Sequence, residues 1–149
     1  MAEGPDRDGA ALSAVQNNIT DTGGPVYALN NAPPDAPELF LISGLTGQVF
    51  PFKRTARLMT DQLQVTGLLF PHLAGVKGRF TSIEQTAEFF RETVAASTRR
   101  RVFVLGYSKG GAIAFDLARR LASDGVPVGL ILFDTSVRAL QTRKHPVRF

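Results

Sequence analysis

The sequence predicts an α/β fold, with a mostly parallel sheet and helices on both of its faces. Two observations carry this prediction. Short apolar runs without polar interruption recur along the chain, and the segments between them place apolar residues every three to four positions. Uninterrupted apolar runs are typical of strands buried on both faces, and the helical segments supply the crossovers that parallel strands need. The 149 residues suffice for one domain with a core of its own.

The first segments lead into the sheet. Residues 1–24 are rich in Gly, Asp, Asn, Thr and Ala and show no period, so we interpret them as a disordered leader. Residues 25–30 are expected to form a short edge strand, and residues 31–37, with their prolines, a turn-rich linker. The apolar run 39–42 is the first strand of the regular series, and the glycine-bearing stretch 43–47 ends it.

Helices then alternate with strands. A helix is predicted over 50–62, and the next strand over 64–70. The pattern Thr81-x-x-Glu84 is a capping box, which predicts that a second helix begins there. The apolar residues of each helix form one stripe: Phe52, Ala56 and Met59 in the first, and Ile83, Ala87, Phe90 and Val94 in the second.

The last part of the series repeats the alternation. Residues 102–105 are a predicted strand, and the helix after residue 110 places apolar side chains at a spacing of four. Gly125 is expected to end that helix as its C′ glycine. Residues 128–133 form the last predicted strand, with Asp134 at its carboxyl end. The inner face of the helix is Ile113, Leu117 and Leu121.

Composition excludes several kinds of site. The chain has no cysteine, so it can form neither a disulfide nor a thiolate metal site, and its two histidines argue against a histidine-based metal site. No apolar run approaches the ~20 residues of a membrane span, and the N-terminus has no apolar signal region. We therefore expect no metal, no membrane partner and a cytoplasmic location.

The net charge of +4 comes with arginines that lie in clusters. Residues 99–101 precede a predicted strand, and Arg119 and Arg120 lie near the end of the following helix. Both sets are expected at the amino-terminal edge of the sheet, as a solvated basic rim. Because no binding motif accompanies the charge, we expect no nucleic-acid partner. Docking to an acidic protein remains the alternative.

The run Gly106-Tyr107-Ser108-Lys109-Gly110 is the pattern of a nucleophile elbow, a tight strand-to-helix turn that exposes a serine hydroxyl. The apolar strand before it and the amphipathic helix after it are the context that the pattern requires. Ser108 is therefore the candidate nucleophile, and the alternative is an ordinary Gly/Ser turn. Gly106 and Gly110 are expected to lie close together, where a Cβ on either would crowd the serine backbone.

Asp134 is the candidate acid, because it follows the next strand and fits the Ser…Asp/Glu…His order of this architecture. Its alternative is an aspartate in a strand-end turn. An oxyanion hole needs backbone N–H groups aimed at the developing charge. We expect one from Lys109, directly after the serine, and another from Leu45 in the loop after the first strand of the series. All four residues should meet at the carboxyl edge of the sheet.

Three stretches give the chain a resemblance to a known family. They are residues 39–44 with the glycine-bearing loop, residues 106–118 around the serine, and residues 130–136, Leu-Ile-Leu-Phe-Asp-Thr-Ser. Together they resemble the thioesterase domains of non-ribosomal peptide and polyketide synthases and their free-standing type II relatives, from about residue 25 to residue 136. The bulky run after the elbow and the aspartate that closes the next strand are the more discriminating parts.

The resemblance implies an α/β-hydrolase fold and a serine hydrolase. In that family the elbow serine takes an acyl or peptidyl chain from the phosphopantetheine thioester of a carrier protein, and water or a nucleophile on the chain releases it. The implied nucleophile is Ser108, the acid Asp134, and the oxyanion donors Leu45 and Lys109. The implied partner is an acyl or peptidyl carrier protein or a synthase, in natural-product or fatty-acyl biosynthesis. The protein would need no cofactor of its own.

The family's catalytic histidine lies after further strands and a lid region, whereas this chain ends at Phe149. Residues 25–136 are thus expected to be the N-terminal part of such a domain, with the sheet incomplete on its C-terminal side and 137–149 a basic tail. Two histidines are considered as bases. His145 is eleven residues beyond Asp134, so an extended tail could reach the serine, but its basic setting is typical of a solvated tail. His72 follows a predicted strand at the same edge of the sheet, and its alternative is a loop or partly buried histidine. Without a base, the serine hydroxyl is a poor nucleophile at neutral pH.

If no further strand pairs with residues 128–133, we expect them to form an apolar edge strand, which favours self-association. A second hypothesis therefore makes the chain a non-catalytic interaction module that binds a partner through this edge or through the groove beside the serine. A third hypothesis is a general esterase or lipase of the same fold. The chain lacks the HGGG-type loop of many lipases, which weakens that third interpretation.

Overall fold

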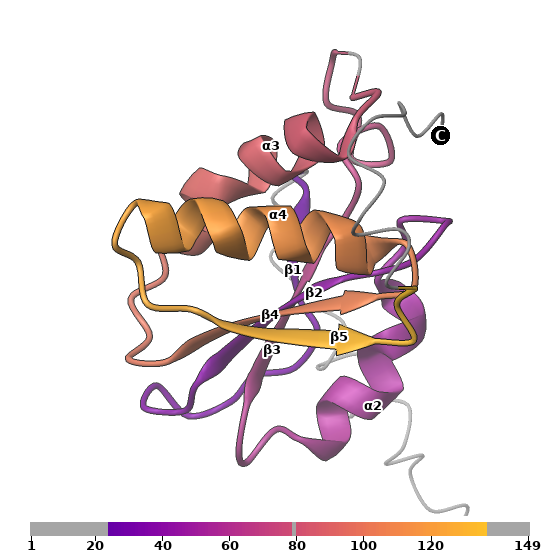
Figure 1. Ribbon diagram of the computed structural model, residues 1–149. Helices are drawn as coiled ribbons and strands as arrows, with labels where there is room; N and C mark the ends of the chain where they lie inside the picture. Colours follow the sequence, from indigo (N-terminus) through magenta and orange to yellow (C-terminus); the bar gives the residue numbers. More distant parts are fainter. Residues whose placement is uncertain (1–23, 79, 137–149) are drawn as a thin grey trace, which may run out of the picture.

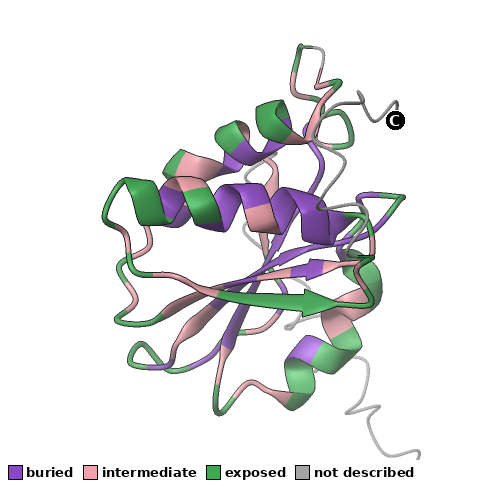
Figure 2. Cartoon of the chain, viewed as in Figure 1, coloured by how far each residue is buried: buried purple, intermediate pink, exposed green. Residues whose placement is uncertain are grey.

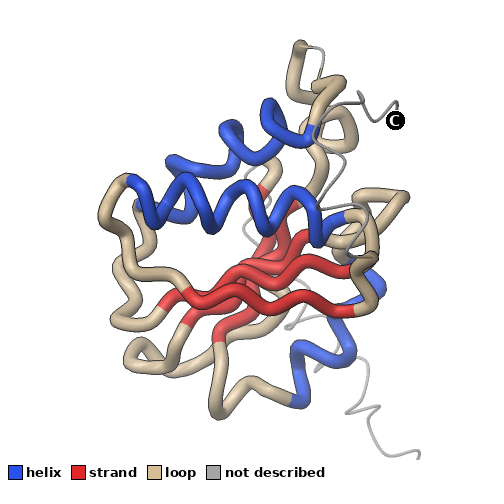
Figure 3. The backbone as a smooth tube through the Cα atoms, viewed as in Figure 1, coloured by secondary structure: helices blue, strands red, loops and turns tan. Residues whose placement is uncertain are grey.

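The computed structural model describes residues 24–78 and 80–136, and within them the predicted α/β fold is confirmed. Helices α3 (Ile83–Ala95) and α4 (Gly110–Ser123) cover one face of the sheet, and α2 (Lys53–Leu58) lies on the other (Figures 1 and 3). The leader and the basic tail predicted at the two ends lie outside the described residues, Gly24 apart.

One sheet of five strands forms in the described part of the chain. The outermost strand β1 pairs antiparallel with its neighbour, as expected of the edge strand predicted over 25–30, and every other pair is parallel. In their order across the sheet the strands are β1 (Val26–Ala28), β3 (Gln64–Leu68), β2 (Glu38–Ile42), β4 (Val102–Tyr107) and β5 (Gly129–Phe133).

The strand order places the helices. From β2 the chain moves through α2 to β3 on one side, and from β3 it crosses through α3 to β4 on the other side of β2. Because parallel crossovers are right-handed, these opposite steps send α2 and α3 to opposite faces. The loops after β2 and β4 therefore leave neighbouring strands toward different faces. Such a switch point is where ligands bind in open α/β sheets.

Each face of the sheet has its own apolar core. The stripe predicted for α3 is confirmed, because Ala87, Phe90 and Val94 are buried against the sheet and Ile83 packs at its margin. The larger core, under α3 and α4, contains Phe40, Ile42, Leu68, Phe70, Ala87, Phe90, Val94, Val104, Ile113, Ala114, Leu117 and Leu121. The core under α2 contains Leu29, Leu41, Val49, Ala56, Val65 and Leu69.

The helix predicted over 50–62 is shorter in the structure. A single 3-10 turn, Phe50–Phe52, precedes α2, which ends at Leu58. The end has a long-range cause: the side-chain amide of Asn30 donates to the carbonyls of Ala56 and Leu63, each at 2.8 Å, and so holds the chain where it turns back toward β3. Ala56 faces the core as predicted.

The capping box predicted at Thr81 lies one residue further along. Ser82 is the N-cap of α3, and its hydroxyl accepts from the backbone N–H of Gln85 at 3.2 Å. The side chain of Gln85 in turn accepts from the backbone N–H of Thr81 at 2.9 Å. The prediction was wrong by one position, because Ser82 caps the helix and the side chain of Gln85 reaches back to the N–H of Thr81, the residue before the cap.

Gly125 ends α4 as predicted, with a φ of 77°. The N–H of Val126 donates to the carbonyl of Leu121 at 2.9 Å, and the N–H of Gly125 to that of Ala122 at 3.1 Å. These two bonds form a Schellman motif, which needs a residue in the left-handed region at C′. Val126 also packs against the apolar core, so the chain is turned back toward β5.

Strand β5 is the edge of the sheet within the described residues, and it is apolar on both faces. Leu130 is 37% exposed, Ile131 41%, Leu132 39% and Phe133 62%. Figure 2 shows most of this strand exposed, while β2 and β3 further back are almost wholly buried and β4 between them is largely intermediate. The register with β4 puts Ile131 and Phe133 on the face of α2.

Candidate active site at the carboxyl edge of the sheet

Ser108 lies in the turn between β4 and α4, in the strand–turn–helix context that its motif requires. Its φ is 53°, in the left-handed region that a residue with a Cβ rarely adopts. The backbone N–H of Ser108 donates to the carbonyl of Phe133 at 2.9 Å. The turn is therefore fastened to the end of the neighbouring strand β5.

The glycines of the elbow lie close together, as predicted. A Cβ on Gly106 would lie 2.6 Å from the carbonyl oxygen of Gly110 and 2.7 Å from Cβ of Ala114. A Cβ on Gly110 would overlap the carbonyl oxygens of Ile42 and Ser43. These glycines therefore let α4 approach β4 and the end of β2.

The loop after β2 lies directly against the serine. A Cβ on Gly44 would lie 3.2 Å from Cβ of Ser108. Gly44 and Gly47 close a tight turn through a 3.1 Å backbone hydrogen bond, which leaves Leu45 at its exposed tip. Among the hydrogen bonds of the described residues, none uses the backbone N–H of Leu45 or of Lys109. Lys109 directly follows the elbow serine, and Leu45 lies in the loop whose Gly44 packs against it, so both expected oxyanion donors belong to segments that meet at Ser108.

Asp134 directly follows β5 and is exposed, with a φ of 51°. Since β4 and β5 are neighbours in register, the turn that carries Asp134 lies beside the elbow, at the same edge of the sheet (Figure 1). In the described residues, no hydrogen bond involves the carboxylate of Asp134 or the hydroxyl of Ser108. The two groups share an edge without touching through a hydrogen bond.

Of the two histidines considered as bases, the structure describes only His72. His72 is exposed in the loop after β3, where its ring contacts that of Phe70 edge-on with centroids 6.1 Å apart. His145 lies outside the described residues. Within the described part of the chain, the structure brings no histidine into a hydrogen bond with Ser108.

The residue after Asp134 is a structural neighbour of the serine that the sequence did not single out. The hydroxyl of Thr135 lies 3.2 Å from the carbonyl oxygen of Ser108. A Cβ on Gly111 would overlap this threonine side chain. The doubled glycine at 110–111 was the available signal, because it indicates a close approach that one glycine of the motif does not require.

Ser43 holds a buried hydroxyl beside the site. The residue is 2% exposed, and its hydroxyl has no hydrogen-bond partner among the described residues. It lies at the end of β2, between the core and the Gly44–Gly47 turn. Burial of an unpaired hydroxyl costs about 1–3 kcal/mol, so this position lowers the stability of the fold next to Ser108.

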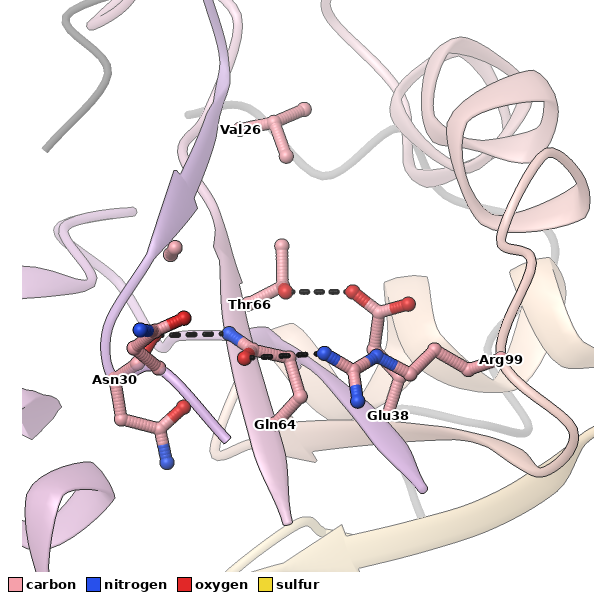
Figure 4. Close-up of a pocket in the computed structure, with 8 residues that line it drawn as sticks. Val26, Asn30, Glu38, Gln64, Thr66 and Arg99 are labelled. Carbon is pink, nitrogen blue, oxygen red and sulfur yellow. Dashed lines mark hydrogen bonds between the residues drawn. The ribbon is translucent and has the colours of Figure 1, made fainter. Parts of the chain in front are cut away.

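A concavity lies at the opposite end of the strands from Ser108. It has a volume of about 380 Å³ and lies beside the amino ends of β2 and β3 (Figure 4). Its polar groups bind one another: Thr66 donates to Glu38 at 2.7 Å, and Gln64 donates to the backbone carbonyl of Asn30 at 3.0 Å. Arg99 donates to the carbonyl of Ala36 at 3.1 Å. The network ties the β1–β2 connection to the sheet.

The arginines of α4 lie at the surface, with Arg119 exposed and Arg120 partly buried, and both are paired with carboxylates. Asp116 accepts from Arg119 at 2.8 Å and from Arg120 at 2.6 Å. Arg120 also pairs with Glu88 of α3 at 2.8 Å. Burial opposes ionisation of Asp116, but the hydrogen bonds and charges of Arg120 and Arg119 more than offset it and lower its pKa. This network joins α3 to α4 and neutralises much of the local positive charge.

Residues 24–78 and 80–136 contain no group of three or more His, Cys, Asp or Glu side chains placed to hold a metal ion. Over the same ranges, no helix has the length and apolar character to cross a membrane.

Comparisons with known proteins agree with this architecture. Residues 38–148 match the family model of the thioesterase domain. The nonribosomal peptide synthetase atrA of Aspergillus terreus is 30% identical over 123 residues, which is 80% of this chain and 13% of that protein. The Vlm2 thioesterase domain, solved with a bound dodecadepsipeptide, is 29% identical with a TM-score of 0.67, over 77% of this chain and 46% of that one.

A type II thioesterase shares the fold. BorB, from the borrelidin biosynthetic cluster, superposes with a TM-score of 0.66 and 23% identity over 72% of this chain and 45% of that one. The chain therefore spans less than half the length of each of these three relatives.

Proposed function

Because the chain belongs to the thioesterase domain family, we propose that it is an acyl-thioester hydrolase that works through Ser108. The observation that carries the proposal is the left-handed backbone of Ser108, in the turn between β4 and α4, at the switch point of β2 and β4 and against the loop after β2. Strain of this kind persists where the surrounding structure enforces it, and it is frequent at sites of function.

The proposed chemistry begins at the serine hydroxyl. Its oxygen attacks the carbonyl carbon of a thioester, the carbon–sulfur bond breaks, and the thiol leaves with the proton of the serine. The backbone N–H groups of Leu45 and Lys109 would stabilise the negative charge on the carbonyl oxygen. Water, or a nucleophile on the acyl chain, then attacks the ester and restores the serine. In this scheme, Asp134 would orient the base.

The proposed substrate is an acyl or peptidyl chain carried on phosphopantetheine, and the proposed partner is the carrier protein or synthase that presents it. Support comes from the relatives: one is a nonribosomal peptide synthetase, and another is a thioesterase domain solved with a depsipeptide. No cofactor is required for this chemistry. Because no base contacts Ser108 in the described residues, we expect slower acylation than in a relative that carries a histidine at its serine.

A fluorophosphonate probe tests the nucleophile. It phosphonylates an activated serine, and peptide mapping by mass spectrometry identifies the residue. We expect an adduct on Ser108 that disappears in Ser108→Ala and persists in Ser136→Ala, a matched change at an exposed serine beyond β5. No adduct on Ser108, under conditions that label an intact thioesterase domain, would contradict the proposal.

Thioesters and oxygen esters separate this proposal from a general esterase. The same acyl group is offered as an N-acetylcysteamine thioester and as an ethyl ester, and hydrolysis is followed for both. A thioesterase site is expected to prefer the thioester. Faster hydrolysis of the ethyl ester would favour the esterase interpretation instead.

The exposure of β5 favours a second candidate function, in which the chain associates through this edge. A five-residue strand without a charged side chain has an outer edge that no other described strand pairs with, and it presents four exposed apolar side chains. We expect light scattering to detect dimers or larger species that Ile131→Pro reduces and Ser108→Ala leaves unchanged. A monodisperse monomer at high concentration would argue against this role.

A further inference from the structure

We propose that Thr135 is a positioning residue that fixes the turn of Asp134 to the turn of Ser108. The inference rests on the proposed function, because the two turns matter together only if both residues serve one reaction. Thr135 directly follows Asp134 and is partly buried, and its side chain points back between the ends of β4 and β5.

Three carbonyl oxygens converge on the Thr135 hydroxyl. They belong to Ser108 at 3.2 Å, Phe133 at 3.3 Å and Gly106 at 3.4 Å. A hydroxyl has one proton to donate, so it is shared among these acceptors. Gly106 and Ser108 belong to β4 and the elbow, and Phe133 to β5. The single donor therefore sits where the two strand ends meet.

The Phe133 carbonyl also accepts the N–H of Ser108 at 2.9 Å. Both backbone polar groups of Ser108 are thus bound: its N–H donates to the end of β5, and its carbonyl oxygen accepts from the hydroxyl of Thr135. Through this pair of contacts, a shift of the turn after β5 would move the elbow as well.

The first turn of α4 makes room for this contact. A Cβ on Gly111 would overlap the hydroxyl and the methyl group of Thr135. The threonine side chain therefore occupies the space that the absent glycine side chain leaves. This accounts for a glycine at 111, which the Gly-x-Ser-x-Gly pattern itself does not demand.

The contact of Thr135 with the elbow matters because the backbone is strained on both sides of it. Ser108 and Asp134 have φ values of 53° and 51°, and Thr135 bridges the two turns. Residues in this region keep their conformation only while their surroundings hold them there. Without the hydroxyl, both turns can relax, and the serine hydroxyl and the carboxylate lose their fixed relation. A displacement of about 1 Å at a reacting group can lower a rate about a hundredfold.

The test uses two variants and two measurements. Thr135→Val keeps the branched shape and removes the donor, and Thr135→Ser keeps the donor and removes the methyl group. We expect Thr135→Val to slow phosphonylation of Ser108 by about tenfold or more, and Thr135→Ser to stay within about threefold of the wild type. Rescue by serine distinguishes positioning by the hydroxyl from simple packing.

Amide hydrogen exchange supplies a readout that needs no activity. Thr135→Val should lower the protection of the Ser108 amide, which binds Phe133, and leave the amide of Ala118 in the middle of α4 unchanged. If the wild type is not labelled at all, the proposed function fails, and the exchange result still decides the role of Thr135. Wild-type protection of Ser108 in Thr135→Val, or a Thr135→Ser variant as impaired as Thr135→Val, would overturn the inference.

Discussion

Ser108 and Asp134 are the two non-glycine residues with positive φ in the described part of the chain, and both lie at the carboxyl edge of the sheet. Backbone strain is thus concentrated at the proposed site. The surrounding glycines make this geometry possible by letting α4 approach β2 and β4. At the scale of single residues, the site depends on the absence of a Cβ atom at these glycines as well as on the side chains of Ser108 and Asp134.

Gly106→Ala should be strongly destabilising. Its Cβ would meet the backbone of the Gly110–Gly111 turn and Ala114, which cannot retreat without moving α4. We expect a loss of about 3 kcal/mol in the free energy of unfolding, measured by urea denaturation. Gly75→Ala is the control, because its Cβ meets open space and its positive φ alone costs about 1 kcal/mol. Equal losses in the two variants would show that the close approach is not a constraint.

Ser43→Ala should stabilise the protein. The change removes a buried hydroxyl that has no partner among the described residues and leaves a methyl group of similar size. We expect an increase of about 1 kcal/mol in the free energy of unfolding. A decrease in stability would mean that the hydroxyl has a favourable interaction, and would refute this account of the position.

At the scale of elements, α3 and α4 act as one layer. They share the larger apolar core. The ion pair of Arg120 with Glu88 joins the two helices, and the pair of Arg120 with Asp116 lies within α4. Arg120, in the third turn of α4, thereby links this helix to α3, and Asp116 holds the Arg120 side chain in place. The two helices pack together on the sheet, and α4 begins directly after the elbow, so this packing also fixes the first turn of α4.

Asp116→Asn tests this layer through pH. The arginines lower the pKa of Asp116, so its carboxylate stabilises the fold above the ordinary aspartate pKa of about 3.9, and this contribution is lost as the pH falls through the lower folded-state value. We expect the variant to lose about 1 kcal/mol at pH 7. The difference from the wild type should shrink as the pH falls below about 4.

The control for this prediction is Glu92→Gln, which removes a charge from an exposed position of α3 with no ion pair among the described residues. Thermal unfolding over a series of pH values compares the three proteins. A stability difference for Asp116→Asn that persists undiminished into the acid range would contradict the ion-pair account.

The same scale shows what local patterns could predict. The strands and the buried faces of α3 and α4 follow from apolar periodicity, which packing then satisfies. The end of α2 could not be predicted, because the side chain of Asn30 that fixes it is distant in sequence. The start of α3 was ambiguous, since adjacent residues offer two equivalent capping pairs.

At the scale of the whole molecule, the order of the strands assembles the site. Placing β4 between β2 and β5 brings the loop after β2, the elbow and the turn of Asp134 to one edge. The sequence could predict that edge for each residue separately, since each follows a strand. It could not predict the contact of Thr135 with the elbow, because that contact depends on the neighbouring register of β4 and β5.

The most direct measurement of the central claim is transfer of an acyl group from a phosphopantetheine thioester to this chain. The protein is incubated with the acyl-phosphopantetheine, the reaction is quenched in acid, and the protein is digested. The mass of the peptide that contains Ser108 is then measured by mass spectrometry. The account predicts a mass increase equal to the acyl group on Ser108, which Ser108→Ala lacks. Acylation at other residues alone, or none under conditions that acylate an intact thioesterase domain, would contradict it.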